Sequence, residues 1–354
     1  MTKLPERNLD LLRACAVLSV WFAHLSQTLR REVGDHGLGR VGVLAFFVHT
    51  ALVLMSSIER GGDAEGGWVR TFYVRRAARV YPLVWVTIAL CVGGDLAFST
   101  VTQGGMPVLA SAAAHTWRSV WSNALLVQNL VGAENVVIPL WTLPIEMQMY
   151  VLLPAAYLLA RRRGVGAVLL ALVAAAAMEA AVPFVPWPGI KRITVIAFVP
   201  CFMSGVLAYA MLRRKAARLP SWSWFALVPL WWIAALSAPI TLLPIGWAAC
   251  LVLGVCIATT KELPASMVTR ASGIIAKYSF GIYLLHMPAW SIAFDKTGAA
   301  PRAVQWALYL VLLVGMPVAA YHLVEAPAIQ WVRLRLPTAF PLSGLIRSRA
   351  TADL

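Results

Sequence analysis

Charged residues are scarce in this sequence. Asp, Glu, Lys and Arg together make up 13% of the 354 residues, whereas hydrophobic residues make up 60%. Charged residues account for about 25% of an ordinary soluble domain. The scarcity of charge therefore excludes a soluble fold of this size and indicates a chain that crosses a membrane several times.

Cysteine and acidic residues are scarce as well. The five cysteines lie in apolar runs without CxxC spacing, which is typical of small buried hydrophobes, so we expect no disulfide framework and no metal. They are Cys15, Cys91, Cys201, Cys250 and Cys256. Only 15 acidic residues stand against 30 Lys and Arg, a net charge of +15. Because the basic residues lie in short loops between apolar runs, we assign them to membrane topology and expect no nucleic-acid partner.

Ten apolar runs have about the length needed to cross a bilayer. They cover residues 8–29, 39–58, 80–98, 140–160, 164–184, 193–212, 222–240, 242–260, 279–296 and 303–325. If the shorter run at 117–130 does not cross, the inside segments hold 21 Lys and Arg and the outside segments 8, as the positive-inside rule requires. We therefore predict an all-α integral membrane protein with about ten transmembrane helices and both termini cytoplasmic. The N-terminus shows no small-residue cleavage site, so we expect no cleaved signal peptide.

The first span carries three ionisable residues on one stripe. At about 100° per residue, Arg13 and His24 are only about 20° out of phase, and Asp10 lies about 40° from His24 on the other side. Charged groups in hydrocarbon are costly and usually face a protein interior or a wet cavity. Asp10 and Arg13 have the spacing of an ion pair near the membrane surface. His24 lies deeper, about 16 Å beyond Arg13, and we favour a chemical role for it.

The third span begins with a basic cluster. Arg75, Arg76 and Arg79 lie at its predicted cytoplasmic end, and the last two are neighbours at i,i+3. Arginines with this spacing can hold a phosphate or pyrophosphate through charge-assisted hydrogen bonds. Basic clusters at inner helix ends also set topology and meet anionic lipid, and the spacing alone favours that second interpretation.

The fourth span carries Glu146 with Tyr150 one turn later, so both lie on one face of the helix. By the predicted topology Glu146 has a depth similar to that of His24. A carboxylate at that depth either serves chemistry or pairs with a polar neighbour for structure.

The last two spans carry further polar residues. Ser279, Tyr283 and His286 recur at i, i+4 and i+7 on the ninth span. His322 and Glu325 are neighbours near the inner end of the tenth span. Both groups could line a site or form structural hydrogen bonds between helices. His49, within an apolar run, receives no predicted role.

Five separated blocks carry a family resemblance. They are LDLLRA with His24, FFVHTALVL, RRAARVYPLVW, WTLPIEMQMY and YSFGIYLLHMP, followed by Glu325-Ala326-Pro327. In this order they resemble the acyltransferase family 3 of membrane proteins, which O-acylate glycans and some secondary metabolites. The resemblance covers residues 7–335 as one acyltransferase-3-type transmembrane domain and leaves 336–354 as a short cytoplasmic tail. The family usually has Ser-Gly where this chain has Thr50-Ala51, so we transfer no role to that position.

The resemblance implies two substrates on opposite sides of the membrane. An acyl-CoA donor, most commonly acetyl-CoA, would enter from the cytoplasm, and an acceptor hydroxyl would be presented outside. Arg76 and Arg79, with Arg13, would hold the CoA phosphates or the thioester region. His24 would be the central catalytic group, either as a general base toward the acceptor hydroxyl or as a group that is itself acylated.

The same resemblance implies supporting roles for other residues. Glu146 would orient His24 or bind the acceptor, and Asp10 is grouped with Arg13 among the catalytic residues. The substrate cavity would be lined by Tyr150, Tyr283, His286, Glu325 and Trp141. Acceptor recognition would come from the outer segment 99–139.

The implied acceptor is a glycan, a lipid-linked glycan or a small glycoside, and the implied location is a bacterial cytoplasmic membrane. The main rival is a transporter or flippase with a His–Glu proton relay, which ten spans would also suit. Against it, the sequence shows no paired halves and no broken helices in matching positions. A purely structural membrane subunit would leave the interior ionisable residues unexplained.

Overall fold

The fold is helical throughout the part of the chain that can be described. The computed structural model describes residues 4–30, 37–61, 67–98, 116–186, 188–214, 218–224 and 243–336. Within these ranges there is no β-strand, only an isolated bridge between Leu219 and Thr260. The predicted all-α class is therefore confirmed.

The helices are α1 (Glu6–Arg30), α2 (Gly37–Gly61), α3 (Trp68–Phe98), α4 (Trp117–Ala124), α5 (Gln128–Val131), α6 (Thr142–Ala181), α7 (Val195–Leu212), α9 (Leu243–Thr259), α10 (Met267–Trp290), α11 (Arg302–Ala320) and α12 (Ala326–Arg335). The 3₁₀ turns include η2 (Ile138–Trp141) and η4 (Pro188–Arg192). Single π-helical turns, Ser291–Asp295 and Tyr321–Glu325, follow α10 and α11.

Six helical stretches of the described residues are long and apolar enough to cross a membrane, and α9 is a shorter apolar helix. This finding supports a helical membrane protein. The ten-span count and the cytoplasmic position of both termini stay predictions. The predicted span at 222–240 lies almost entirely outside the described residues, as do residues 99–115 of the predicted outer segment.

Two predicted spans, 140–160 and 164–184, correspond to α6 and the 3₁₀ turns at its two ends, and α6 is interrupted where the sequence predicted a loop. Gly164 has φ 74° and ψ −162°, a conformation that glycine adopts far more readily than other residues. It follows the three consecutive arginines at 161–163. The interruption separates α6 into two helical parts, of which the first carries the candidate site residues.

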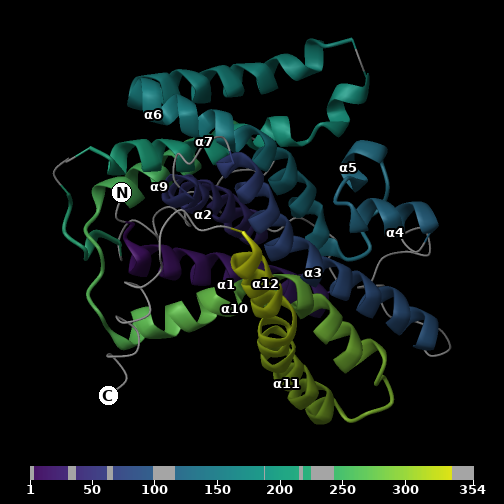
Figure 1. The fold of residues 1–354 in the computed structure, drawn as a ribbon. Helices are drawn as coiled ribbons and strands as arrows, with labels where there is room; N and C mark the ends of the chain where they lie inside the picture. Colours follow the sequence, from purple (N-terminus) through teal and green to yellow (C-terminus); the bar gives the residue numbers. More distant parts are fainter. Residues whose placement is uncertain are drawn as a thin grey trace.

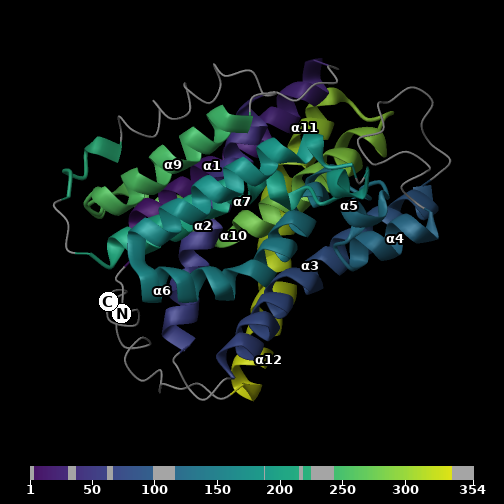
Figure 2. The same ribbon diagram turned by 90° about the horizontal axis from the view of Figure 1, so that it is seen from above.

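The helices form a series of packed neighbours. α1 lies between α2 and α10, α2 packs on α7, and α7 contacts both α6 and α9 (Figure 1). On the other side α11 packs on α10, and α12 lies against α3, as both views show (Figure 2). Segments from both ends of the chain, α1 and α10, therefore lie side by side at the centre of the fold.

The contact between α2 and α7 bears on the departure at Thr50-Ala51. Ala51 is fully buried, and a Cβ built on Gly205 of α7 would lie 2.8 Å from the Cβ of Ala51 and 2.2 Å from the carbonyl oxygen of Val48. The glycine needed for close helix approach is therefore supplied by α7. α2 and α7 therefore lie close together, although α2 lacks the glycine that the family resemblance leads us to expect there.

Candidate active site

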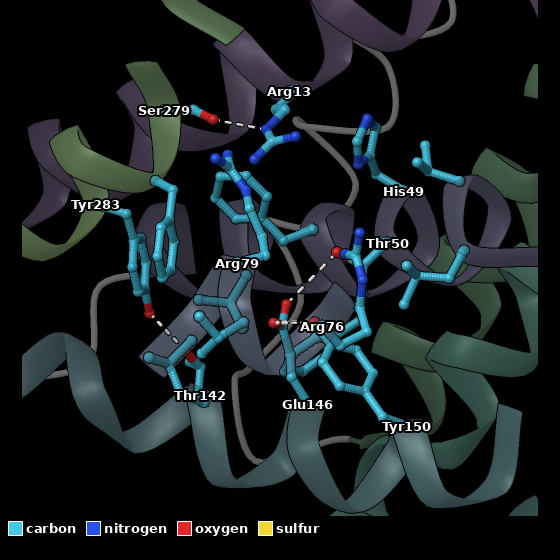
Figure 3. Close-up of a pocket in the computed structure, with 18 residues that line it drawn as sticks. Arg13, His49, Thr50, Arg76, Arg79, Thr142, Glu146, Tyr150, Ser279 and Tyr283 are labelled. Atoms are coloured by element: carbon cyan, nitrogen blue, oxygen red, sulfur yellow. Dashed lines mark hydrogen bonds between the residues drawn. The ribbon is translucent and has the colours of Figure 1, made fainter. Parts of the chain in front are cut away.

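A charged cavity lies at the centre of the helices. It has a volume of about 160 Å³ and is walled by residues of α1, α2, α3, α6 and α10 (Figure 3). Its polar side chains are Arg13, His49, Thr50, Arg76, Arg79, Thr142, Glu146, Tyr150, Ser279 and Tyr283. Six of them are predicted site residues: Arg13, Arg76, Arg79, Glu146, Tyr150 and Tyr283. Residues from helices far apart in the sequence thus line one common cavity.

Three arginines give the cavity its positive charge. Arg13 donates from Nε to the hydroxyl of Ser279, at 2.6 Å. Arg79 forms an ion pair with Glu325, whose side chain is 1% exposed, and the Arg79 guanidinium also lies 5.6 Å from the centre of the Phe280 ring. These contacts hold the guanidinium groups at fixed positions. Arg13 and Arg79 are thereby held in the cavity wall, with the charge of Arg79 balanced by Glu325.

Glu146 places a carboxylate opposite the arginines. Tyr150 donates its hydroxyl to Oε2 of Glu146 at 3.0 Å, and the Thr50 hydroxyl lies 3.4 Å from Oε1. In Figure 3 Glu146 points into the cavity from α6, whereas Arg13 points into it from α1. The cavity therefore offers both signs of charge within one small volume.

Tyr283 connects α10 with the start of α6. Its hydroxyl donates to the carbonyl oxygen of Pro139 at 3.0 Å and lies 2.8 Å from the hydroxyl of Thr142. The Thr142 hydroxyl also lies 3.3 Å from the same Pro139 carbonyl oxygen, so either hydroxyl can be the donor in the contact between Thr142 and Tyr283. This network fixes the first turn of α6, from which Glu146 projects.

His24 and His286 face each other from α1 and α10. Nδ1 of His24 lies 2.8 Å from Nε2 of His286, and the two ring planes are 9° apart. Nδ1 of His286 lies 2.9 Å from the carbonyl oxygen of Ile282, which can only accept, so this nitrogen carries the proton. When both rings are neutral, His24 therefore donates from Nδ1. Its Nε2 then has a free lone pair, the form that a general base requires.

The remaining predicted site residues lie outside the cavity wall. The two histidines lie beyond the wall, with His286 one turn after Tyr283 on α10. Asp10 faces α10 near Gly273. Glu325 does not line the cavity, but it forms an ion pair with Arg79, which does. Trp141 lines a different cavity on the other side of α6.

The polar wall residues without a predicted role are His49, Thr50 and Thr142. His49 is 5% exposed and lines the cavity, and Thr50 contacts Glu146. No sequence signal separates His49 from an ordinary residue of an apolar helix, and Thr50 was marked only as a departure from the family pattern. Elsewhere in the described part of the chain, no three His, Cys, Asp or Glu side chains are grouped so that they could hold a metal ion.

The fold and the cavity define a class: a helical membrane protein with buried ionisable groups around a central cavity. Comparison with known proteins narrows that class. The family model described as "Acyltransferase domain", the model for acyltransferase family 3, matches residues 6–322. The chain therefore belongs to this acyltransferase family, and it is an O-acyltransferase. The membership decides between enzyme and transporter in favour of the enzyme.

Two curated relatives are similar over nearly their whole length. Nodulation protein 10 of Rhizobium leguminosarum bv. viciae is 26% identical, over 92% of this chain and 94% of the relative. Acyltransferase MdmB of Streptomyces mycarofaciens is 26% identical, over 96% of this chain and 95% of the relative. No solved structure matches the chain.

Proposed function

We propose that the protein transfers an acyl group, acetyl in the simplest case, from cytoplasmic acyl-CoA to a hydroxyl group of an extracytoplasmic glycan or glycoside. The observation that carries the proposal is the arginine-lined cavity beside a histidine pair, within a chain of the acyltransferase family. The enzyme would act in a bacterial cytoplasmic membrane, surrounded by lipid.

The charge of the cavity supports acyl-CoA as the donor. Arg13, Arg76 and Arg79 present guanidinium groups to one space, and such groups bind phosphate and polarise carbonyl oxygens. About 160 Å³ is too small for a whole CoA molecule. We therefore propose that the thioester end of the donor passes the cavity arginines toward His24, with the nucleotide end toward the predicted cytoplasmic side.

The tautomer of His24 supports a role as the group that receives a proton. As a general base, Nε2 takes the proton of the acceptor hydroxyl while the hydroxyl oxygen attacks the thioester carbonyl. The C–S bond then breaks, and the CoA thiolate takes the proton from His24. In the second route Nε2 itself attacks the carbonyl, and CoA leaves as the thiolate. The acceptor hydroxyl then attacks the acyl-imidazolium, the C–N bond breaks, and the hydroxyl proton passes through the freed Nε2 to the CoA thiolate. Both routes use the same nitrogen.

The names of the relatives bear on the acceptor. One is a nodulation protein and the other is an acyltransferase. We propose a glycan, a lipid-linked glycan or a small glycoside as the acceptor. Its hydroxyl would approach from the outer side of the membrane, because the predicted topology places His24 nearer to that side than Arg13.

The test uses membrane vesicles from cells that express the wild type, His24→Ala or His322→Ala. His322 is an exposed histidine on the π-helical turn after α11 and is the matched control. Given acetyl-labelled acetyl-CoA, the wild type and the control should label glycan or lipid. His24→Ala should label it at least about a hundredfold more slowly, the range expected when an acid–base group is lost.

The outcomes separate the parts of the proposal. If His24→Ala transfers label at the wild-type rate, His24 is a structural polar residue and its assignment is wrong. If the wild type transfers no label from several acyl-CoAs in vesicles that contain the candidate acceptors, the donor assignment is wrong.

A further inference from the structure

A second cavity, separate from the charged one, lies beside the first turn of α6. It has a volume of about 190 Å³ and lies between α5, the segment after it, η2, α6 and the start of α7. The residues that matter for the argument are Gln128, Asn129, Asn135, Trp141, Thr194 and Phe198. None of the residues that line this cavity carries a charge. In this respect it is the opposite of the central cavity.

Polar groups in this wall have unused hydrogen-bonding capacity. Gln128 is 2% exposed, and its Nε2 donates to Oδ1 of Asn135 at 3.2 Å and to the carbonyl oxygen of Leu140 at 3.1 Å. Because both partners are acceptors, the orientation of the amide is fixed. Oε1 of Gln128 then has no partner among the described residues. A buried acceptor without a partner costs free energy until a donor reaches it.

Two donors in the same wall are also available. The amide nitrogen of Asn135 has no hydrogen-bond partner among the described residues, because only its oxygen is used by Gln128. The hydroxyl of Thr194 accepts from Nδ2 of Asn129 at 2.9 Å, which leaves its own proton free. The cavity therefore presents both donors and acceptors, and all of them are neutral. This combination suits hydroxyl groups, which donate and accept at once.

Aromatic rings form another part of the wall. Trp141 and Phe198 have ring centres 6.1 Å apart with planes inclined at 52°. Pockets of this kind hold small molecules by apolar contact and orient them with a few polar groups. A pyranose ring fits this description, because its C–H face packs on an aromatic ring while the hydroxyls at its edge reach the amides.

The first turn of α6 separates the two cavities. Trp141 and Ile145 face the neutral cavity, whereas their chain neighbours Thr142 and Glu146 face the charged one. We infer that the neutral cavity is a subsite for an uncharged sugar ring of the acceptor, an inference that rests on the proposed function. The first turn of α6 lies between a sugar held there and the cavity assigned to the acyl donor.

The test uses the full-length protein in lipid nanodiscs and ligand-observed saturation-transfer NMR. The probes are the methyl glycosides of glucose, N-acetylglucosamine and rhamnose, with sorbitol as an open-chain polyol control. Trp141→Ala removes the aromatic wall. Asn135→Asp keeps the oxygen that accepts from Gln128 but removes the amide donors. Trp121→Ala, at an exposed tryptophan of α4 outside both cavities, is the matched control.

At least one methyl glycoside should bind the wild type and Trp121→Ala through its ring protons, and sorbitol should not bind. Trp141→Ala and Asn135→Asp should each weaken that binding about tenfold, with the KM for acetyl-CoA unchanged. Asn135→Asp conserves shape, so it tests the site even if Trp141→Ala misfolds.

Failure of the sugar site and failure of the proposed function give different results. If the wild type transfers acyl groups but binds no glycoside, or if both variants bind glycoside like the control, the inference is overturned and the function stands. If glycoside binding depends on Trp141 and Asn135 while no acyl-CoA yields transfer, the sugar site stands and the proposed function falls.

Discussion

The hydrogen bond from His24 to His286 should control turnover without affecting donor binding. His286→Phe keeps a planar ring of similar size at a position that is 2% exposed, but it removes the acceptor that lies 2.8 Å from Nδ1 of His24. Without this acceptor, neutral His24 no longer prefers to carry its proton on Nδ1. The tautomer with the proton on Nε2 then competes, and it cannot act as a base or nucleophile at that nitrogen.

The size of the effect follows from the lost contact. A buried donor left without its partner costs about 1–3 kcal/mol. If that free energy is what holds the reactive tautomer, kcat should fall about 5- to 160-fold, since each 1.36 kcal/mol is a factor of ten. His286→Gln should restore part of the rate, because its amide oxygen can accept from Nδ1 of His24 near the original position of Nε2.

The assay is release of CoA from acetyl-CoA in nanodiscs with a saturating acceptor, measured for kcat and KM separately. His322→Phe, the same substitution at an exposed histidine that contacts Tyr278 at 3.3 Å, is the control and should be neutral. A wild-type kcat for His286→Phe would refute the reasoning. So would a rate for His286→Gln as low as that for His286→Phe, because a purely steric role would not distinguish an acceptor from a ring.

Three further predictions concern the charged cavity and the helix packing. Arg79→Gln leaves the carboxylate of Glu325 buried without its partner, at a cost of about 3–5 kcal/mol, so the Tm of the purified protein should fall. Adding Glu325→Gln should recover much of the Tm but not acyl-CoA turnover. Gly205→Ala puts a Cβ 2.2 Å from a carbonyl oxygen of α2 and should lower the free energy of unfolding by about 1–3 kcal/mol, measured by chemical denaturation. Gly166→Ala, which meets nothing within 4 Å, should leave it unchanged. Tyr150→Phe removes a 3.0 Å hydrogen bond to the cavity carboxylate and should lower kcat/KM about fivefold in the CoA-release assay, the equivalent of about 1 kcal/mol.

Most of the helix positions followed from apolar run length alone. Where the helix bounds in the structure differ from the predicted runs, the reason is that hydropathy marks apolar segments, whereas a helix can extend beyond them. α3 begins at Trp68, well before the predicted 80, because a hydropathy run ends at charged residues whereas a helix does not. Arginine has a high helix propensity, so the basic turn with Arg75, Arg76 and Arg79 simply continues the helix.

The residues of the charged cavity were easier to predict than their partners. Arg13 and Glu146 stood out because an ionisable residue within an apolar span needs a reason to be there, whereas Arg76, at the end of its predicted span, received a site role only through the family resemblance. The partner of His24 could not be predicted, because His286 is 262 residues away and only packing of α1 on α10 brings the rings together. His49 is a related case. A single histidine in an apolar run gives no sign of which helix face borders a cavity.

The contacts between α1 and α10 connect the site with the predicted topology. Arg13 contacts Ser279 and His24 contacts His286, so the two helices run in the same direction. If both helices are spans, as predicted, parallel packing requires an odd number of crossings between them, and the predicted ten-span order has an odd number there. Along α1 the arginine and histidine are separated by about 16 Å, whereas their partners on α10 are separated by about 10 Å. The long side chain of Arg13 absorbs the difference.

This arrangement gives the site two levels along one helix pair. The level of Arg13 joins the cavity to which we assign the acyl donor, and the level of His24 lies further toward the predicted outer side. An enzyme that takes its donor from one side of the membrane and its acceptor from the other needs its anion-binding and proton-accepting groups displaced in this order. Parallel packing of α1 on α10 supplies this displacement, because each helix contributes one residue to each level. Arg13 and Ser279 form the first level, and His24 and His286 form the second.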